Sequence, residues 1–241
     1  MNSPPALPYQ IFEIQLQDGQ KRPFYHRGTR ADLGVIRQIF TDNDYALEKL
    51  RRVDELRGLF QGMKQPLIMD CGANIGASVV WFAYRYPGCH IVAFEPEAEN
   101  YHLLCKNTEG LNVDLRLAAI GSQNGKVSVF DPGSGEWGYR TQQDDQGSCD
   151  RLSITEVIES KVSAGYTPFI TKIDIEGGES NLFETSTDWV ADMPIMIIEL
   201  HDWLMPKKGT SRNFIACVAK YDRDFVHIRE NIFSIKNDLA S

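Results

Sequence analysis

The sequence predicts an α/β fold with a doubly wound, mostly parallel sheet, and three observations carry this prediction. From Pro66 onward, short apolar runs rich in β-formers alternate with helical stretches, the pattern of strand–helix–strand units. A glycine-rich turn joins one of these strands directly to a helix. The last two strands are separated only by Glu230 and Asn231, which is too short for a crossover, so they must pair as an antiparallel hairpin.

Length and composition set the class of protein. A chain of 241 residues predicts one large domain with an appendage. Apolar residues make up 42% and charged residues 24%, close to the globular average, which argues against wholesale disorder. The net charge of −8 argues against nucleic acid and anionic membrane surfaces as partners.

The cysteines and the first residues predict a cytoplasmic location. The five cysteines are odd in number and form no Cys-x-x-Cys pair, which favours reduced thiols over a disulfide framework or a zinc site. The N-terminus lacks the basic and apolar regions of a signal peptide. No run approaches the roughly 18 apolar residues of a membrane span.

Residues 1–62 are predicted to form an N-terminal hairpin and helical extension. Residues 11–16 and 21–26 alternate like strands and are joined through Asp18-Gly19, a hairpin signal. Apolar residues at helical spacing predict helices near 32–40 and 45–60.

Residues 63–241 are predicted to form the α/β domain. A long loop at 131–149 carries Trp137 and Tyr139 among glycines, so it is a candidate lid, or else a mobile hairpin loop. The predicted strands are 67–71, 90–94, 113–117, 126–130, 168–173, 194–200, 224–229 and 232–236. The predicted helices lie near 75–86, 97–108, 152–163, 178–189 and 211–221.

The glycine-rich turn runs from Asp70 through Gly72, Ala73 and Asn74 to Gly76. A dinucleotide-binding loop would carry a second glycine where this chain has Asn74, so the match fails where pyrophosphate must approach the backbone. We expect the Asp70 carboxylate to point into the site, where it would repel phosphate and suit a cation. The loop therefore favours S-adenosylmethionine, which carries an ammonium and a sulfonium. The alternative for Asp70 is a helix-cap carboxylate.

The next strand ends at Glu95, 19 residues after Gly76, and Pro96 then begins a helix. An acidic residue at this distance accepts hydrogen bonds from ribose hydroxyls in nucleotide-binding folds. The alternative for Glu95 is a surface acid before a helix.

These residues resemble the class I S-adenosylmethionine-dependent methyltransferases, in particular the FkbM family. The resemblance covers roughly residues 24–205, with Gly178 in place of a common alanine. The motifs that carry it are, in order, Arg27-x-Gly-Thr-x-x-Asp32, Asp70-x-Gly-Ala-Asn-x-Gly76, Phe94-Glu95-Pro96, Ala118-Ala-Ile-Gly121, Lys172-Ile-Asp-Ile-Glu-Gly-Gly-Glu179 and Ile198-Glu-Leu-His201.

The resemblance implies a Rossmann-like, seven-stranded sheet with an antiparallel last strand, and a methyltransferase domain over residues 63–241. It implies that the cofactor is S-adenosylmethionine and that the acceptor is a hydroxyl of a glycan or a secondary metabolite. The residues that it assigns to the cofactor are Asp70, Gly72, Ala73, Asn74, Gly76, Glu95, Pro96 and Ala119.

The catalytic candidates follow the next two strands. Asp174 lies just past strand 168–173, and Glu199 and His201 end strand 194–200. Ligands bind beyond the carboxyl ends of strands in open parallel sheets, so we expect these side chains beside the methyl group. His201 is the candidate general base, with Asp202 orienting its imidazole.

Two neighbouring acids and a metal site are weighed against this interpretation. Glu179 reads as a helix cap, and Glu176 shares a side with Asp174 if the strand persists. Asp174, Glu199 and His201 could also hold magnesium or manganese. Because three ligands on two strands are a weak signal, the prediction includes no metal and keeps one as an alternative.

The predicted function is S-adenosylmethionine-dependent O-methylation of a sugar, a glycan or a small metabolite, with no nucleic-acid or membrane partner. The alternatives are a nicotinamide-dependent oxidoreductase, disfavoured by Asn74, and a catalytically silent cofactor-binding module. Arg27 and Asp32 either pair to cap a helix or belong to an appendage that closes over the cofactor. The sequence leaves the acceptor and the oligomeric state open.

Overall fold

A seven-stranded sheet forms the centre of the computed structural model, which describes residues 9–16, 19–133 and 138–239. The strand order is β12-β13-β11-β10-β3-β4-β5, and β13 runs antiparallel to both of its neighbours. The predicted α/β fold with an antiparallel final strand is therefore confirmed. The strands are β3 (Pro66–Cys71), β4 (His90–Phe94), β5 (Val113–Arg116), β10 (Thr167–Ile173), β11 (Ile195–Glu199), β12 (Arg223–Ile228) and β13 (Asn231–Lys236).

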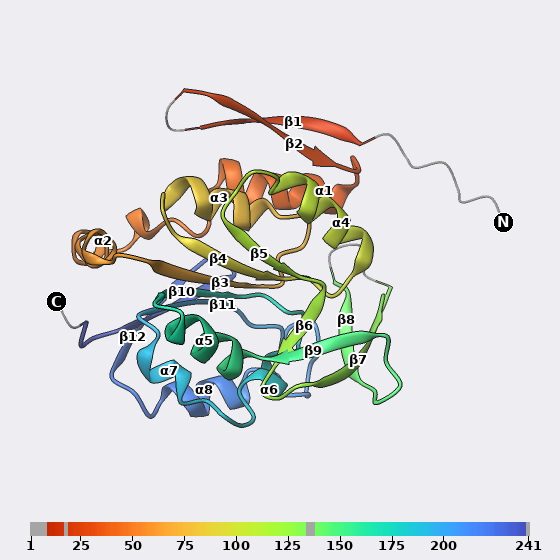
Figure 1. Cartoon of the computed structure of the whole chain (residues 1–241). Coiled ribbons are helices and arrows are strands. Elements are labelled where there is room, and N and C mark those ends of the chain that lie inside the picture. The colour runs from red at the N-terminus through yellow and green to blue at the C-terminus, as the bar shows by residue number, and fades with distance from the viewer. Residues whose placement is uncertain (1–8, 17–18, 134–137, 240–241) are drawn as a thin grey trace.

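Helices cover both faces of this sheet (Figure 1). The first helices of the chain lie with α3 (Ala77–Arg85) and α4 (Ala98–Asn107) on one face. The opposite face carries α5 (Ile154–Ser163), α6 (Glu179–Leu182), α7 (Trp189–Asp192) and α8 (Arg212–Val218).

The prediction of a single helix at 178–189 is wrong, because the chain forms two short helices there, α6 and α7. Between them Ser186 has a left-handed backbone with φ of 53°. The linking residues include serine, threonine and aspartate, whose side chains compete with helical hydrogen bonds.

The central strand β3 is buried along its whole length and separates two apolar clusters. Leu67 and Met69 point into the cluster shared with α5, α7 and α8, and Ile68 points into the cluster shared with α3. Successive side chains of a strand alternate between faces, so both clusters depend on this one segment. Burial on both faces is why the segment appears in the sequence as a continuous apolar run.

The N-terminal extension forms a hairpin followed by helical turns. The strands predicted at 11–16 and 21–26 are present as β1 (Gln10–Gln15) and β2 (Lys21–His26), although Asp18 of the expected turn lies outside the described residues. Helix α1 (Arg30–Ile36) continues into a π-helical turn, η1 (Arg37–Thr41).

The second helix of the extension begins later than predicted. Residues 45–60 were expected to form one helix, but the chain forms a 3-10 turn, η2 (Leu47–Lys49), and then α2 (Val53–Gly62). Leu50 between them is extended and only 4% exposed. Burial of the residues before α2 therefore outweighs the local helical periodicity.

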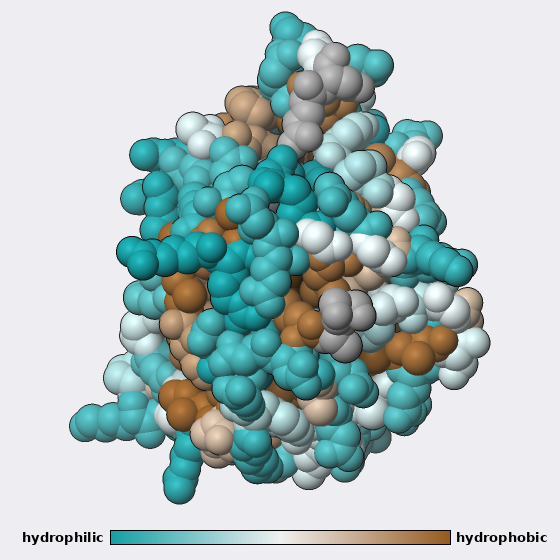
Figure 2. All heavy atoms as spheres, turned by 90° about the vertical axis from the view of Figure 1, so that its left-hand side faces the viewer, coloured by the Kyte–Doolittle hydropathy of each residue, from teal (hydrophilic) through white to brown (hydrophobic). Residues whose placement is uncertain are grey.

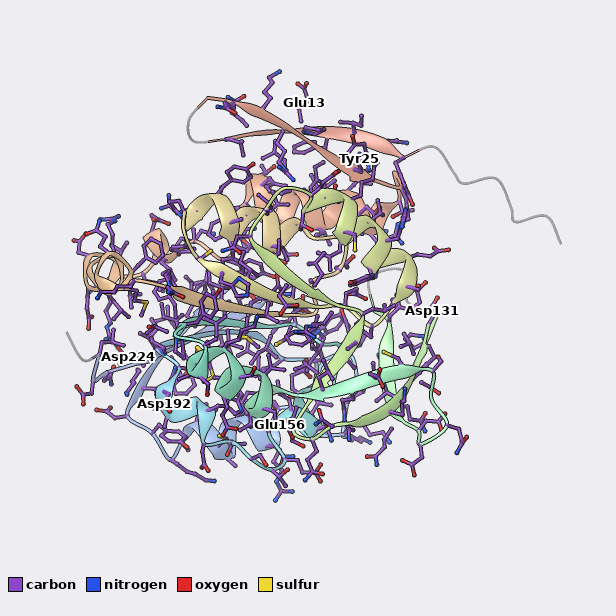
Figure 3. The ribbon with its side chains drawn as sticks, viewed as in Figure 1. Glu13, Tyr25, Asp131, Glu156, Asp192 and Asp224 are labelled. Carbon is purple, nitrogen blue, oxygen red and sulfur yellow. The ribbon has the colours of Figure 1, made fainter. Side chains whose placement is uncertain are left out.

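The hairpin packs on the helical layer through one face. Phe24 is fully buried and meets the ring of Phe40 edge-to-face, with 5.3 Å between ring centroids. Tyr25 faces α4, with the Lys106 ammonium 4.1 Å from its ring centroid, whereas Glu13 points to solvent (Figure 3). The extension thus shares an apolar cluster with the central sheet.

A second, four-stranded sheet lies beside the carboxyl ends of the central strands (Figure 1). Its order is β6-β9-β7-β8, so the strand predicted at 126–130 exists but pairs here rather than in the central sheet. Part of the predicted loop 131–149 forms β8, and Trp137 lies outside the described residues. The strands are β6 (Ala118–Gly121), β7 (Gly125–Phe130), β8 (Arg140–Gln143) and β9 (Cys149–Ser153).

The face that carries α2 is mostly hydrophilic, with separate apolar patches (Figure 2). Among the described residues, no helix is both long enough and apolar enough to cross a membrane.

We expect Phe24→Ala to lower the free energy of unfolding by about 3–5 kcal/mol, because the deletion leaves a cavity beneath the hairpin. Chemical denaturation measures the change. Ile11→Ala is the control on the same hairpin, since its side chain is 58% exposed and its loss should change stability by less than about 0.5 kcal/mol. Equal effects of the two variants would show that the hairpin is not part of the cooperative core.

Candidate functional site

A cavity of about 970 Å³ lies at the carboxyl ends of β3, β4, β10 and β11. This is the edge where ligands bind in open α/β sheets. The lining comes from the glycine-rich turn, the end of β4 with the start of α4, the small sheet and residues beside it, the segments after β10 and β11, the N-terminal α1 and η1, and the turn before β13.

The glycine-rich turn is held against the end of β10. Gly72 has φ of +88°, and a side chain there would overlap the carbonyl oxygen of Asp174. The Lys172 ammonium donates a hydrogen bond of 2.6 Å to the Gly72 carbonyl oxygen. Only glycine allows both this backbone conformation and this close approach.

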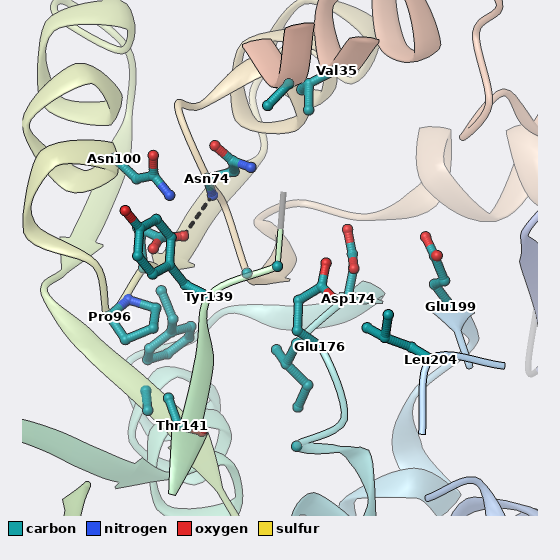
Figure 4. A pocket seen from close by; sticks show the side chains of 18 of the residues that line it. Val35, Asn74, Pro96, Asn100, Tyr139, Thr141, Asp174, Glu176, Glu199 and Leu204 are labelled. Atoms are coloured by element: carbon teal, nitrogen blue, oxygen red, sulfur yellow. Dashed lines mark hydrogen bonds between the residues drawn. The ribbon is translucent and has the colours of Figure 1, made fainter. Parts of the chain in front are cut away.

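Glu95 closes the turn from the neighbouring strand. Its carboxylate accepts hydrogen bonds from the backbone N–H groups of Asn74 (2.8 Å) and Glu97 (2.9 Å), the first of which is drawn in Figure 4. Burial raises the pKa of Glu95 to about 7, although both hydrogen bonds act to lower it. The carboxylate lines the cavity and can accept hydrogen bonds from a ligand there.

Five of the predicted cofactor residues line the same cavity, namely Gly72, Asn74, Glu95, Pro96 and Ala119. They come from three separate chain segments that the fold brings together. This grouping agrees with a single cofactor site at the end of β3 and β4.

Asp70, Ala73 and Gly76 do not line the cavity. Asp70, which we expected to point into the site, is fully buried beneath the turn. It accepts a 2.5 Å hydrogen bond from the Ser78 hydroxyl and lies 3.4 Å from the Lys172 ammonium. Asp70 and Lys172 are partners across β3 and β10, so the negative charge of Asp70 is compensated inside the sheet. The Asp70 side chain therefore stabilises the glycine-rich turn from below.

The N-terminal extension supplies another wall of the cavity. Arg27 pairs with Asp32 at 2.6 Å and donates a 2.9 Å hydrogen bond to Asn100 of α4. Thr29 caps α1 by accepting a hydrogen bond from the Asp32 backbone N–H. Arg27 and Asp32 therefore pair as one interpretation of this signature expects, although Thr29 caps the helix, and α1 also lines the cavity, as Val35 shows in Figure 4.

Three carboxylates project into the other end of the cavity. Asp174, Glu176 and Glu199 all line it (Figure 4). The expected alternation of Asp174 and Glu176 required the strand to continue past Ile173, but the strand ends at that residue. Instead, Glu176 has a left-handed backbone with φ of 54°, and its carboxylate still reaches the cavity.

His201 lies behind these carboxylates and is only 1% exposed. Its Nε2 lies 3.6 Å from an oxygen of each of Asp174, Glu176 and Glu199. Its Nδ1 lies 2.9 Å from the buried Glu179 carboxylate. The group that orients the imidazole is therefore Glu179, read from the sequence as a helix cap, and not Asp202.

The charges around His201 shift its proton affinity. Burial lowers the pKa of His201, but the hydrogen bond with Glu179 and the surrounding negative charges outweigh it and raise the pKa to about 9. Burial, followed by the charge of Asp174, raises the pKa of Glu176 to about 7 and that of Glu199 to about 8.

Two aromatic residues complete the cavity. Tyr139 lies on the side of Pro96 and Asn100 in Figure 4, and the prediction from the sequence includes it only as part of a candidate lid. Trp203 lines the cavity with a side chain that is 69% exposed, and it is not among the site residues predicted from the sequence. The sequence feature that could have indicated Trp203 is its position two residues after the candidate His201.

Residues 70–237 match the model of the methyltransferase FkbM domain. The chain belongs to this family. The resemblance stated from the motifs is therefore confirmed, and with it S-adenosylmethionine as the cofactor. The family match favours a methyltransferase over the nicotinamide-dependent alternative.

The chain resembles two curated methyltransferases. The hexuronic acid methyltransferase AglP of Haloferax volcanii is 24% identical over 178 residues, which cover 68% of this chain and 72% of that protein. Methyltransferase sdnD of Sordaria araneosa is 33% identical over 73 residues, which cover 30% of this chain and 24% of that protein.

Among solved structures, the chain is similar to an O-methyltransferase from Bacillus cereus in complex with SAH, with 14% identity and a TM-score of 0.44. That match covers 84% of this chain and 91% of the other. A putative O-methyltransferase from Klebsiella pneumoniae gives the same identity and TM-score over 84% and 90% of the two chains.

The contact between Gly72 and Asp174 predicts a large difference between two glycine substitutions. Gly72→Ala must adopt a left-handed backbone, at roughly 1–2 kcal/mol, and also displace the end of β10. Gly88→Ala is the matched control, because Gly88 has φ of +87° and open space around it. We expect only Gly72→Ala to abolish S-adenosylmethionine binding in calorimetry. Binding retained by both variants would contradict the proposed close packing.

The raised pKa of Glu95 predicts that cofactor affinity depends on pH. Hydrogen bonds from ribose hydroxyls favour the ionised carboxylate, so affinity should be full above the pKa of about 7 and fall as protonation occurs below it. Between pH 8 and pH 6 the ionised fraction drops about tenfold, which sets the largest expected loss of affinity. The comparison with Glu95→Gln by calorimetry isolates this residue. Glu95→Gln should lack the part of the pH dependence that comes from this carboxylate. Equal pH dependence of cofactor affinity in both proteins would exclude Glu95 as its origin.

Proposed function

We propose that this methyltransferase transfers the methyl group of S-adenosylmethionine to a hydroxyl of a carbohydrate. The observation that carries the proposal is that the end of the cavity lined by Gly72, Asn74 and Glu95 opens onto the end lined by Asp174 and Glu199. The first end offers backbone and a carboxylate to the adenosine part of the cofactor. The second offers acceptors for the hydrogen bonds of hydroxyl groups.

Asp70, Ala73 and Gly76 serve the cofactor indirectly in this proposal. They shape the turn that presents Gly72 and Asn74, since none of the three lines the cavity. Asp70 acts through its contacts with Ser78 and Lys172. Pro96 and Ala119 belong to the wall beside the cofactor's adenosine.

The carboxylates of Asp174 and Glu199 would receive the acceptor. Their side chains are 28% and 13% exposed, so a hydroxyl in the cavity can reach them. His201 is nearly inaccessible and does not line the cavity. We therefore assign the direct contact, and the uptake of the hydroxyl proton during in-line attack on the methyl group, to Asp174, with His201 positioning it.

A carbohydrate acceptor is supported by two features. The exposed ring of Trp203 lies at the cavity, where an aromatic face can pack against the C–H face of a sugar. The Haloferax volcanii relative is named for methylation of a hexuronic acid. Together they favour sugars over other hydroxylated metabolites.

The test is transfer of a labelled methyl group from S-adenosylmethionine to neutral hexoses, hexuronic acids and non-sugar hydroxylated metabolites. We expect product with sugars, and we expect Asp174→Asn to lower kcat by about 100-fold or more. Asp192→Asn, which changes an exposed carboxylate at the end of α7, is the matched control and should keep full activity. Transfer to non-sugar hydroxyls alone would overturn the carbohydrate assignment. Cofactor binding without transfer to any acceptor would favour the silent cofactor-binding module.

A further inference from the structure

The buried imidazole of His201 has one ring nitrogen with a partner and one that faces a cluster of carboxylates. Nδ1 lies 2.9 Å from Glu179 Oε1, and the Glu179 side chain is fully buried. A carboxylate at this position accepts the Nδ1–H hydrogen, so Nε2 is the nitrogen that faces the other carboxylates, and a cation that binds there replaces the Nε2 proton of the imidazolium. The His201 side chain is only 1% exposed, so water does not compete freely for Nε2.

The carboxylates opposite Nε2 lie at a distance that suits a shared ion. Nε2 is 3.6 Å from Asp174 Oδ1, from Glu176 Oε2 and from Glu199 Oε1. These separations are longer than hydrogen bonds. Ligand atoms about 2.1 Å from a metal ion, at octahedral or tetrahedral angles, lie roughly 3.0–3.4 Å from one another. A contraction of the cluster, whose ligand atoms lie within 4.8 Å of one another, would therefore produce coordination distances.

We propose that Asp174, Glu176 and His201 bind one divalent metal ion, with Glu199 beside it. One ligand atom from each of the three residues lies within 4.8 Å of the other two. The sequence suggested Glu199 rather than Glu176 as the third ligand. The left-handed backbone of Glu176 turns its carboxylate toward His201, which sequence spacing does not reveal.

The charges of the cluster favour a cation. Lys172 lies 3.5 Å from Asp174 but also 3.4 Å from Asp70, so its single charge is divided between two carboxylates. Glu176 and Glu199 are 22% and 13% exposed, and solvent screens them only in part. One imidazole with several carboxylates suits a transition ion of the Mn²⁺ type better than Ca²⁺.

The metal site goes beyond the proposed function, and binding of the ion needs no acceptor. A consequence that does rest on the proposed function concerns acidic sugars. The carboxylates at this end of the cavity would repel the carboxylate of a hexuronic acid. A divalent ion would reverse that local field and attract acceptor oxygens.

The test is a titration of the full-length, chelator-treated protein with Mn²⁺, with free Mn²⁺ measured by electron paramagnetic resonance. We expect one bound ion per chain, and we expect Asp174→Asn and His201→Gln to weaken its affinity by about tenfold or more. Glu176→Gln is a milder second variant should either of these fail to fold, which circular dichroism detects.

The orienting carboxylate provides a matched pair of variants. Glu179→Gln should weaken Mn²⁺ binding by about tenfold, because it removes the charge that fixes the imidazole. Asp202→Asn, next to His201 in sequence, should leave the affinity unchanged. No binding of Mn²⁺ at millimolar concentration, or equal binding by wild type and all the folded ligand variants, would overturn the proposal. Mn²⁺ binding without methyl transfer would contradict only the proposed function.

Discussion

The site depends on the approach of two loops across the middle of the sheet. The chain leaves β3 toward β4 and returns through β10 on the other side, so a crevice opens between them. Gly72 lies against the Asp174 carbonyl group, and the Lys172 ammonium bridges to the Gly72 carbonyl oxygen. This contact fixes the glycine-rich turn relative to the carboxylates that follow β10. A side chain at residue 72 would separate the two halves of the cavity.

Negative charge at this edge serves two different purposes. Asp70 is compensated by Lys172 and Ser78 inside the sheet, where it stabilises the turn. The carboxylates after β10 and β11 remain in or beside the cavity, and His201 meets three of them through one nitrogen. The net charge of −8 is thus partly concentrated where a cationic ligand is expected. Electrostatic attraction in a half-buried cleft is stronger than at an open surface because solvent screens it less.

The N-terminal extension is joined to the cofactor turn by polar contacts as well as by its apolar face. The Asn107 side chain accepts a hydrogen bond from the Tyr25 backbone N–H and donates to the carbonyl oxygens of Tyr25 and Ile75. Arg27 reaches Asn100 on the same helix. Asn107 is only 1% exposed, and a buried amide without these partners would be costly. The extension therefore holds α1 over the cavity while α4 holds the turn.

Local patterns in the sequence were sufficient to predict the α/β sheet, the order of the motifs and the position of the glycine-rich turn. Hydrophobic periodicity and the glycine at 72 are local signals, and both survive in the folded chain. Three features become visible only in the folded chain: Asp70 is buried, Glu179 rather than Asp202 orients His201, and β7 pairs outside the central sheet. Each of these depends on a partner distant in sequence. Local patterns show that a residue is acidic or that a segment forms a strand. Tertiary packing decides which residue neutralises the acid and which strand pairs with the segment.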